Sequence, residues 1–419
     1  MQFESAARRT AAAAIGIGVL LLAATGCSAP REVTIDLPAQ TDAAFPAEVQ
    51  DQLTDAVSSA MTATGSTGAI VGVWAPWSGS WVAGVGDADP GDAFRIADVT
   101  RAMTCDVLYQ LDAEGVVSVD DPITDYVASI ASVPAEVTLG RLCDGTSGLG
   151  SYSSRVGTDF VRTPERRWNP NELAAYGVAD IDPTRIGTVW GDSDAAYVLL
   201  GLALEKASGR SASDLLREYV TEPLGLSHTS LPGTAASAPG DPALSGLVLL
   251  PDAEGALECD APTDVTVLSS SIGFTDSGAV STVDDLARYV QALATQALMP
   301  EGEDRFADPF LVTPNLPSWF TTTGGAFLAG SLVGQIGAVP GYMTAAFADP
   351  TTGLTVAVVL NNSTASGMVA GYLAWELAAI ASKAPAASGE TAPEAGLPWT
   401  AEQYHEEILA NAVCAPPAS

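Results

Sequence analysis

The sequence predicts an α/β (α+β) fold in which one sheet is built from both ends of the chain, with a helical region inserted between them. Apolar runs with strand character occur early and late, at 68–74, 80–85, 326–333, 343–348 and 354–360. The middle of the chain, from about residue 97 to residue 294, has a mostly helical pattern broken by Gly/Pro loops. With 47% hydrophobic and 16% charged residues, the chain can bury a large core.

Spacing and composition also predict the elements around these strands. The segment from Pro46 to Thr64 predicts a helix. Its apolar residues share one face: Val49, Leu53, Val57 and Met61. Residues 75–79 predict a hairpin turn between the two early strands, and a further helix is expected over 368–382. Residues 384–398, rich in Ala, Pro and Gly, predict a linker to a short amphipathic tail over 401–413.

The N-terminus has the layout of a secretory signal. Arg8 and Arg9 precede an apolar run, 11–24, that is too short to span a bilayer as a helix. Cys27 follows small residues directly, so the segment resembles a bacterial lipoprotein signal, in which Cys27 becomes the lipidated first residue. The alternative is an ordinary signal peptide with a chance cysteine. We expect an extracytoplasmic protein anchored to the bacterial cell membrane by lipid on Cys27.

These features divide the chain into four segments. They are a signal peptide (1–26), a tether (27–45), one domain (46–382) and a linker with a C-terminal tail (383–419). The sheet of the domain is expected from about 66–96 and 326–382, with the helical region between these ranges.

The charge balance excludes nucleic acid as a partner. The chain has 17 Lys and Arg against 50 Asp and Glu, a formal net charge of −33, and its two lysines are Lys206 and Lys383. Proteins that hold a polyanion by charge need clustered cations to displace its counterions.

The cysteines predict disulfides rather than a metal site. Four remain besides Cys27: Cys105, Cys143, Cys259 and Cys414. An even number in an exported chain indicates two disulfides, with three possible pairings, and free buried thiols are the alternative. The sequence has no Cys-x-x-Cys and two histidines, His228 and His405, so a zinc site is not expected. We expect no cofactor.

Five phrases occur in a set order along the chain. They cover 94–127 (beginning FRIADVTRAM), 137–152, 193–229, 278–293 (GAVSTVDDLARYVQAL) and 334–362. Together they resemble the serine beta-lactamase and penicillin-binding-protein family, in particular its class C and DD-carboxypeptidase-like branch. The resemblance extends over about residues 47–382.

The resemblance implies a mainly antiparallel sheet flanked by helices, an inserted all-helical region and an active-site cleft between the two. It makes the helix after Asp98 a neighbour of the helix ending near Cys143, which favours a Cys105–Cys143 disulfide. The second pair we favour, Cys259 with Cys414, would dock the otherwise loose tail. The resemblance also assigns two residues to the cleft wall: Ser147 and Gly337.

Catalysis in this family depends on three motifs. In Ser-x-x-Lys, at a helix start, the serine is acylated and the lysine takes its proton. A Tyr-x-Asn or Ser-x-Asn element supplies a second proton shuttle and an amide. A Lys/His-Thr-Gly strand supplies a cation and a backbone donor for the oxyanion.

All five catalytic positions are changed in this sequence. Asp98 occupies the nucleophile position and Arg101 the base position, although arginine cannot act as a general base because its pKa exceeds about 12. The second motif aligns with Asp192-Ser193-Asp194, and the third begins at Gln335. No Ser-x-x-Lys, Tyr-x-Asn or Lys/His-Thr-Gly occurs anywhere in the sequence. The acyl-serine machinery is therefore absent.

Other nucleophiles are weaker candidates. Thr100 is expected to point away from the helix face shared by Asp98 and Arg101, and Thr104 has a guanidinium beside it instead of a base. Ser147 belongs to a loop that shapes the cleft. Asp98 is in principle a carboxylate nucleophile, but a simpler interpretation is an ion pair with Arg101 at i, i+3 on the first turn of a helix.

The changed residues also change the charge of the cleft. The formal charge of the cleft residues is −2, from three aspartates (Asp98, Asp192 and Asp194) and one arginine (Arg101). A concave site with negative charge repels ligands that end in a carboxylate. The three carboxylates are a weak candidate site for Ca²⁺ or for an amine-bearing ligand. The alternative is solvated acids without a ligand.

We therefore expect a catalytically inactive envelope lipoprotein with the beta-lactamase fold that binds a partner or small ligand. One alternative is an active hydrolase of the family with a non-standard active centre. Another is a purely structural envelope protein.

Overall fold

The computed structural model describes residues 33–394 and 396–414. The expected signal segment and its Cys27 lie outside these residues. Within the two ranges, no helix is both long enough and apolar enough to cross a membrane.

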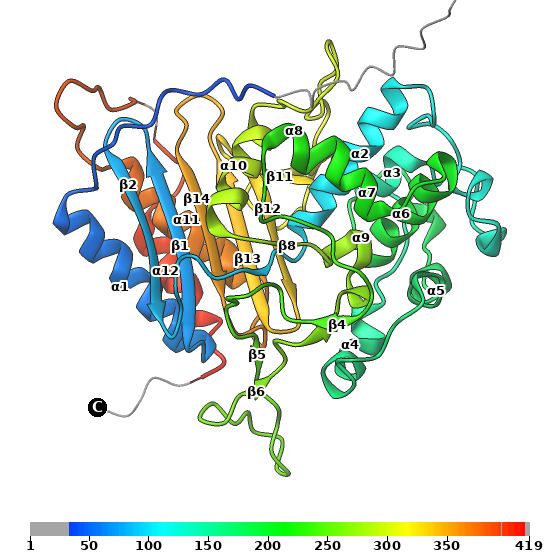
Figure 1. Ribbon diagram of the computed structural model, residues 1–419, viewed down its shortest axis with the longest axis horizontal. Helices are drawn as coiled ribbons and strands as arrows, with labels where there is room; N and C mark the ends of the chain where they lie inside the picture. The colour runs from blue at the N-terminus through cyan, green and yellow to red at the C-terminus, as the bar shows by residue number, and fades with distance from the viewer. Residues whose placement is uncertain (1–32, 395, 415–419) are drawn as a thin grey trace, which may run out of the picture. The chain divides into compact units, whose positions relative to one another are not determined.

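The described part of the expected tether is attached to the domain. The Thr41 N–H donates to Pro76 O at 3.3 Å, and the Ser80 N–H donates to Ala43 O at 3.0 Å. These bonds hold the end of the dark blue segment of Figure 1 against the early hairpin, and the Val33 N–H at its other end donates to Pro223 O at 3.0 Å. This part of the chain is therefore not a free spacer, because its backbone groups find partners on the domain.

Eight antiparallel strands form one large sheet, in the order β2-β1-β14-β13-β12-β11-β10-β9 (Figure 1). Its strands are β1 (Gly68–Ala75), β2 (Gly79–Gly86), β9 (Phe310–Leu311), β10 (Phe320–Thr323), β11 (Ala326–Ala329), β12 (Leu332–Val339), β13 (Tyr342–Ala348) and β14 (Thr355–Leu360). The early strand β1 pairs with the late strand β14, with Ala69 opposite Leu360. The prediction of one sheet built from both ends of the domain is confirmed.

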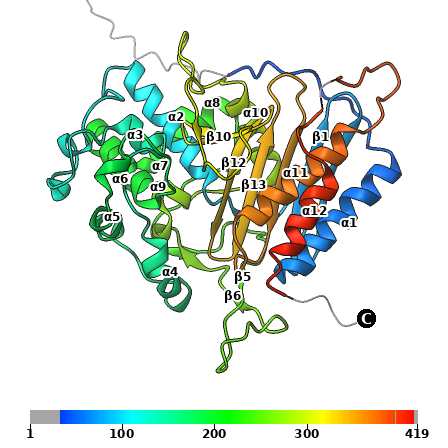
Figure 2. The same ribbon diagram turned by 180° about the vertical axis from the view of Figure 1, so that it is seen from behind.

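Helices cover both faces of the sheet. α1 (Ala47–Thr64), α11 (Met368–Ser382) and α12 (Ala401–Ala410) lie on one face, in front in Figure 2, and α10 (Val283–Ala294) covers the other. The two faces have separate cores because side chains alternate along each strand. In β14, Val358 packs with the core of α1 and α11, and Val359 belongs to the other core. The helices predicted over 46–64 and 368–382 are present.

The late strands differ in detail from the prediction. The run 326–333 is not one strand: it contains β11, a turn at Gly330 and the start of β12. Gly330 has a φ of 60°, a left-handed conformation that glycine adopts at little cost, so the chain reverses within an apolar run. The early segment also leaves the sheet sooner than expected, because β3 (Phe94–Arg95) pairs with β8 (Val280–Ser281).

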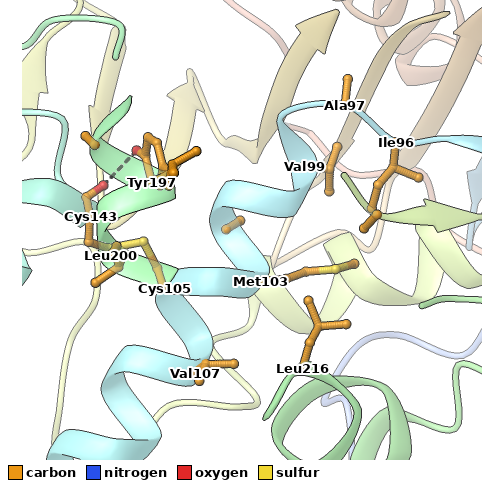
Figure 3. Close-up of a cluster of buried hydrophobic side chains, with 14 of the residues drawn as sticks. Ile96, Ala97, Val99, Met103, Cys105, Val107, Cys143, Tyr197, Leu200 and Leu216 are labelled. Atoms are coloured by element: carbon orange, nitrogen blue, oxygen red, sulfur yellow. Dashed lines mark hydrogen bonds between the residues drawn. A yellow bond between two sulfur atoms is a disulfide. The ribbon is translucent and has the colours of Figure 1, made fainter. Parts of the chain in front are cut away.

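The inserted region is mainly helical, and α2 lies at its centre. Its elements are α2 (Val99–Ala113), α3 (Leu139–Cys143), α4 (Ser153–Arg162), α5 (Pro170–Ala179), α6 (Asp194–Ser208), α7 (Ala212–Leu216), α8 (Glu222–Leu224), α9 (Phe274–Ser277) and the short strands β4 (Ala236–Ser237), β5 (Leu247–Val248), β6 (Thr263–Asp264) and β7 (Leu268–Ser269). The Cys105–Cys143 disulfide joins α2 to the end of α3, as expected. The Tyr197 hydroxyl on α6 donates to Cys143 O at 2.8 Å (Figure 3).

The C-terminal tail folds back onto the domain. α12 packs on α11 and α1, and the Cys259–Cys414 disulfide confirms the second predicted pairing. The Val413 N–H also donates to Ala63 O at 2.8 Å, at the end of α1. The expected linker therefore leads to a docked helix.

Candidate functional site

A cavity of about 710 Å³ lies between the helical region and the sheet. The N-terminal end of α2, the loop before α6 and strand β12 all contribute to its lining. Four of the five changed catalytic positions meet there: Asp98, Arg101, Asp192 and Asp194. Gly337, expected in the cleft wall, also lines the cavity.

Asp98 is held at the start of α2 by a strained turn and a close strand. Ala97 has a φ of 47°, a left-handed conformation that costs a non-glycine residue about 1–2 kcal/mol. Figure 3 shows Ala97 and Val99 where the chain enters α2. Strand β12 passes so close that a Cβ on Gly337 would lie 2.4 Å from Asp98 Cγ. A glycine is therefore required opposite Asp98.

Arg101 is the centre of the site. Its Nη1 lies 3.3 Å from Asp98 Oδ2 and 2.7 Å from Asp192 Oδ1. Its Nε donates to Asp276 Oδ1 at 2.7 Å. Its Cζ lies 4.9 Å from the centroid of the Tyr197 ring. Three carboxylates and an aromatic face hold this guanidinium, which is 8% exposed.

Burial and mutual repulsion set the protonation of the cluster. Burial raises the pKa of Asp98 well above its usual range, against the opposing effect of Arg101. Burial likewise raises the pKa of Asp276 to about 6. For Arg101, burial alone would lower the pKa, but the carboxylates around it, Asp276 first, raise it well above its ordinary value. Arg101 therefore stays charged and accepts no proton.

The two acids of the second motif differ in environment. Asp194, in the first turn of α6, accepts hydrogen bonds from the Tyr152 N–H at 2.6 Å and the Ser153 N–H at 2.9 Å. Burial raises the pKa of Asp194, and these N–H donors oppose the rise. The Asp192 side chain is 61% exposed. Asp192 is thus the acid of the Arg101 cluster that a ligand reaches most easily.

Two predicted site residues do not line the cavity. The Gln335 Nε2 donates to Gly325 O at 2.8 Å, and its Oε1 accepts from the Ile336 N–H at 2.8 Å, so backbone groups occupy its amide. Ser147, expected in the cleft wall, is 1% exposed, and its Oγ accepts from the Leu149 N–H at 3.3 Å. Ser147 is therefore buried behind the cavity wall. Residues 151–153, which follow it in the chain, line the cavity at this place.

The neighbouring hydroxyls on α2 are also turned away from the cavity. The Thr100 Oγ1 donates to Ala97 O at 2.8 Å, and the Thr104 Oγ1 donates to Thr275 O at 2.7 Å. Both side chains are buried and neither lines the cavity.

Sequence reasoning did not identify Asp276. It lies on α9, 175 positions from Arg101, and belongs to none of the family's three motifs. The available signal was its place two residues before the phrase that begins at Gly278.

The aromatic end of the cavity was also missed. This end is lined by four aromatic side chains. They are Phe320 of β10 and Trp319 just before it, Trp375 of α11 and Tyr404 of α12. The tail was expected to dock, but its part in the cavity was not visible from its pattern.

The carboxylates considered for calcium are not arranged as a metal site. Arg101 bridges Asp98 and Asp192, and Asp194 is engaged by backbone N–H groups. Within residues 33–394 and 396–414, no group of three or more His, Cys, Asp or Glu side chains is placed to hold a metal ion.

The family model described as "Beta-lactamase" matches residues 53–379, which include the cavity residues from α2 to α11. The chain belongs to the beta-lactamase family. This is the family of serine hydrolases with the beta-lactamase and penicillin-binding-protein fold. The five ordered segments of the sequence predicted the same family.

Curated relatives of this beta-lactamase family member match over a shorter stretch. The D-alanyl-D-alanine-carboxypeptidase/endopeptidase AmpH of Escherichia coli K12 is 34% identical over 146 residues, 32% of this chain and 36% of AmpH. Penicillin-binding protein 4* of Bacillus subtilis is 26% identical over 142 residues, 32% of this chain and 30% of that protein. The matches therefore span about a third of these relatives.

Solved structures agree on the fold of this beta-lactamase family member. A D-stereospecific amidohydrolase from Streptomyces sp. superposes with a TM-score of 0.65 at 24% identity, covering 76% of this chain and 94% of that one. The penicillin-binding protein homologue from Pyrococcus abyssi gives a TM-score of 0.63 at 22% identity, covering 78% of this chain and 75% of that one.

Proposed function

We propose that this beta-lactamase family member is a catalytically inactive, lipid-anchored envelope protein that uses the family's cavity to bind a ligand or partner. The observation that carries the proposal is the Arg101 cluster. At the positions where the family resemblance calls for a nucleophile and its base, an aspartate and a charged guanidinium lie in contact, with N···O 3.3 Å.

Acylation needs a nucleophile next to a group that takes its proton. Among the described residues that line the cavity there is neither lysine nor histidine. Arg101 keeps its protons, and burial favours the protonated, weakly nucleophilic form of Asp98. The cavity is therefore equipped for binding and not for acyl transfer.

A covalent probe tests this proposal. The purified protein is incubated with a fluorescent penicillin and, separately, with a fluorophosphonate, beside an active penicillin-binding protein as a positive control. We expect no labelling above that of a heat-denatured sample. Labelling near one probe per chain, mapped to any side chain, would show that the protein is an enzyme.

A reversion variant tests how much of the machinery is missing. We expect Asp98→Ser/Arg101→Lys to show no nitrocefin hydrolysis, because Asp192, Asp194 and Gln335 remain changed. Circular dichroism verifies the fold of the variant, and turnover above buffer would contradict the expectation.

The proposed anchor rests on Cys27 and the signal-like segment before it. We expect wild type in the membrane fraction of expressing bacteria and Cys27→Ala released from it. The matched control is Ser28→Ala, which keeps the cysteine. Equal membrane association of Cys27→Ala and wild type would argue against lipidation.

A further inference from the structure

We infer that the cavity binds an organic cation: its amine lies beside Asp192, and its aromatic or other apolar body lies along a wall formed by Trp190 and by aromatic side chains of β10, β11, α11 and α12. The inference rests on the proposed function, since it names the class of ligand for the same cavity. Three observations support it. They are the negative charge of the cavity lining, the continuous series of aromatic rings along one side of the cavity, and the disulfide and packing that hold α12 against the domain.

The charge of the lining selects cations. Its ionisable acids and bases, tyrosines aside, are Asp98, Asp192, Asp194, Asp276, Glu407 and Arg101. Arg101 is already engaged by Asp98, Asp192 and Asp276, so it is not free to pair with an anionic ligand. Even with Asp98 protonated, the acids outnumber the guanidinium. A concave site of this sign attracts cations and repels carboxylates.

Asp192 is the place for the amine. Its side chain is 61% exposed, and Arg101 contacts its Oδ1. Asp98 and Asp276 are largely buried, and Asp194 is bound by backbone N–H groups. Glu407 is exposed but lies on α12, beyond the aromatic rings. An ammonium entering the cavity therefore meets an accessible carboxylate at this end.

Aromatic rings lead from this acid to the tail helix. Trp190 lies two residues before Asp192. Successive ring centroids are separated by 5.8 Å (Trp190–Phe327), 5.1 Å (Phe327–Phe320), 5.0 Å (Phe320–Trp375) and 5.0 Å (Trp375–Tyr404). All five residues line the cavity. Phe320, Trp375 and Tyr404 are 2–4% exposed, so the wall is packed and rigid. A flat apolar body placed along it removes the body's own apolar surface from water.

Two further residues of the lining complete the description of the cavity. Leu316 lines the cavity and is 39% exposed. Trp375 is 2% exposed, and its Nε1–H has no hydrogen-bond partner among residues 33–394 and 396–414. An unpaired buried donor is unusual in a native protein. A volume of about 710 Å³ is that of a small-molecule pocket.

The α12 part of the wall is fixed in place and lies outside the family match. The match ends at residue 379, and α12 begins at Ala401. The Cys259–Cys414 disulfide holds the end of the tail, and His405 Nδ1 lies 3.0 Å from Glu376 Oε1 on α11. Tyr404 and Glu407 thus extend the family's cavity with residues of this chain's own tail.

Three indole probes of similar size test the inference by calorimetry at pH 7. They are tryptamine, tryptophol and indole-3-acetate, which carry charges of +1, 0 and −1. We expect tryptamine to bind at least about fivefold more tightly than tryptophol, with indole-3-acetate weakest. Asp192→Asn should bring the tryptamine to tryptophol ratio close to one. Asp284→Asn, which removes the same charge from an exposed turn of α10, should leave the ratio unchanged.

A variant of the wall tests the position of the apolar body. Tyr404→Ala should weaken tryptamine and tryptophol alike, by about fivefold. Leu409→Ala is the matched control, since Leu409 lies on the same helix and is 49% exposed outside the cavity. Thermal unfolding of both variants verifies that they fold.

Equal affinities for the three probes, no binding of any of them, or tighter binding of spermidine than of tryptamine would overturn the inference. Loss of tryptamine binding alone in Tyr404→Ala would also overturn it, because the amine would then lie at the aromatic end. These outcomes leave the proposed function standing. Covalent labelling by penicillin would overturn the proposed function whatever the indole affinities are.

Discussion

Arg101 determines the electrostatics of the site because three carboxylates share one guanidinium. Removing one partner of a buried ion pair leaves the other charge uncompensated. The loss of folding free energy is then far larger than the stabilisation that an exposed ion pair provides. The Asp98–Arg101 contact was predictable, since i, i+3 residues share a helix face. The Asp276 contact was not, because the fold alone brings α9 to α2 across 175 positions of sequence. The exclusion of Ser147 and Gln335 from the cavity likewise depends on local hydrogen bonds that no motif reveals.

The buried acid on α9 predicts a pH-dependent stability. Burial raises the pKa of Asp276 from 3.8 to about 6. Between these values the folded protein holds a proton that the unfolded chain has released, so the free energy of unfolding falls as pH rises. Asp276→Asn keeps the acceptor and does not titrate. We expect its stability relative to wild type to rise by about 2 kcal/mol between pH 4 and pH 7.

Urea denaturation at several pH values from 4 to 7 measures this difference. Asp284→Asn removes the same formal charge at the surface and serves as the control. A free-energy difference between Asp276→Asn and wild type that stays constant over this range would contradict the buried-acid assignment.

At the scale of elements, long regular patterns were predictable and reversals inside apolar runs were not. The helix over 368–382 has the expected bounds, whereas the run 326–333 conceals a hairpin turn at one glycine. The pattern over 401–413 predicted an amphipathic tail but not which surface it would pack against. That surface, on α11 and α1, is assembled from segments far apart in the sequence.

The second disulfide should determine how firmly α12 is held. Cys259→Ser/Cys414→Ser leaves the aromatic contacts of Tyr404 in place but frees the chain end. We expect α12 amides to lose about 2 kcal/mol of protection from hydrogen exchange, while α11 amides keep theirs. Reduced wild type should behave like the variant. Unchanged protection of α12 in both samples would mean that packing alone docks the tail.

At the scale of the whole molecule, the net charge of −33 opposes compactness through self-repulsion. Salt screens exposed charges, with a Debye length of about 10 Å at 0.1 M. Raising NaCl from about 20 to about 300 mM should therefore raise the unfolding temperature by about 2 °C or more. KCl at the same ionic strength is the control. An unfolding temperature that is independent of salt, or that responds to one cation alone, would contradict screening as the cause.

The pairing of β1 with β14 has a consequence for how the chain acquires its structure. Ala69 meets Leu360, so the early hairpin joins the large sheet only after most of the polypeptide has been synthesised. Contacts of such high sequence separation make folding slow, because a long loop must close before the pairing stabilises it. Until β14 emerges, the edge of β1 that it will cover has no partner, so the early hairpin keeps one open edge during most of the synthesis.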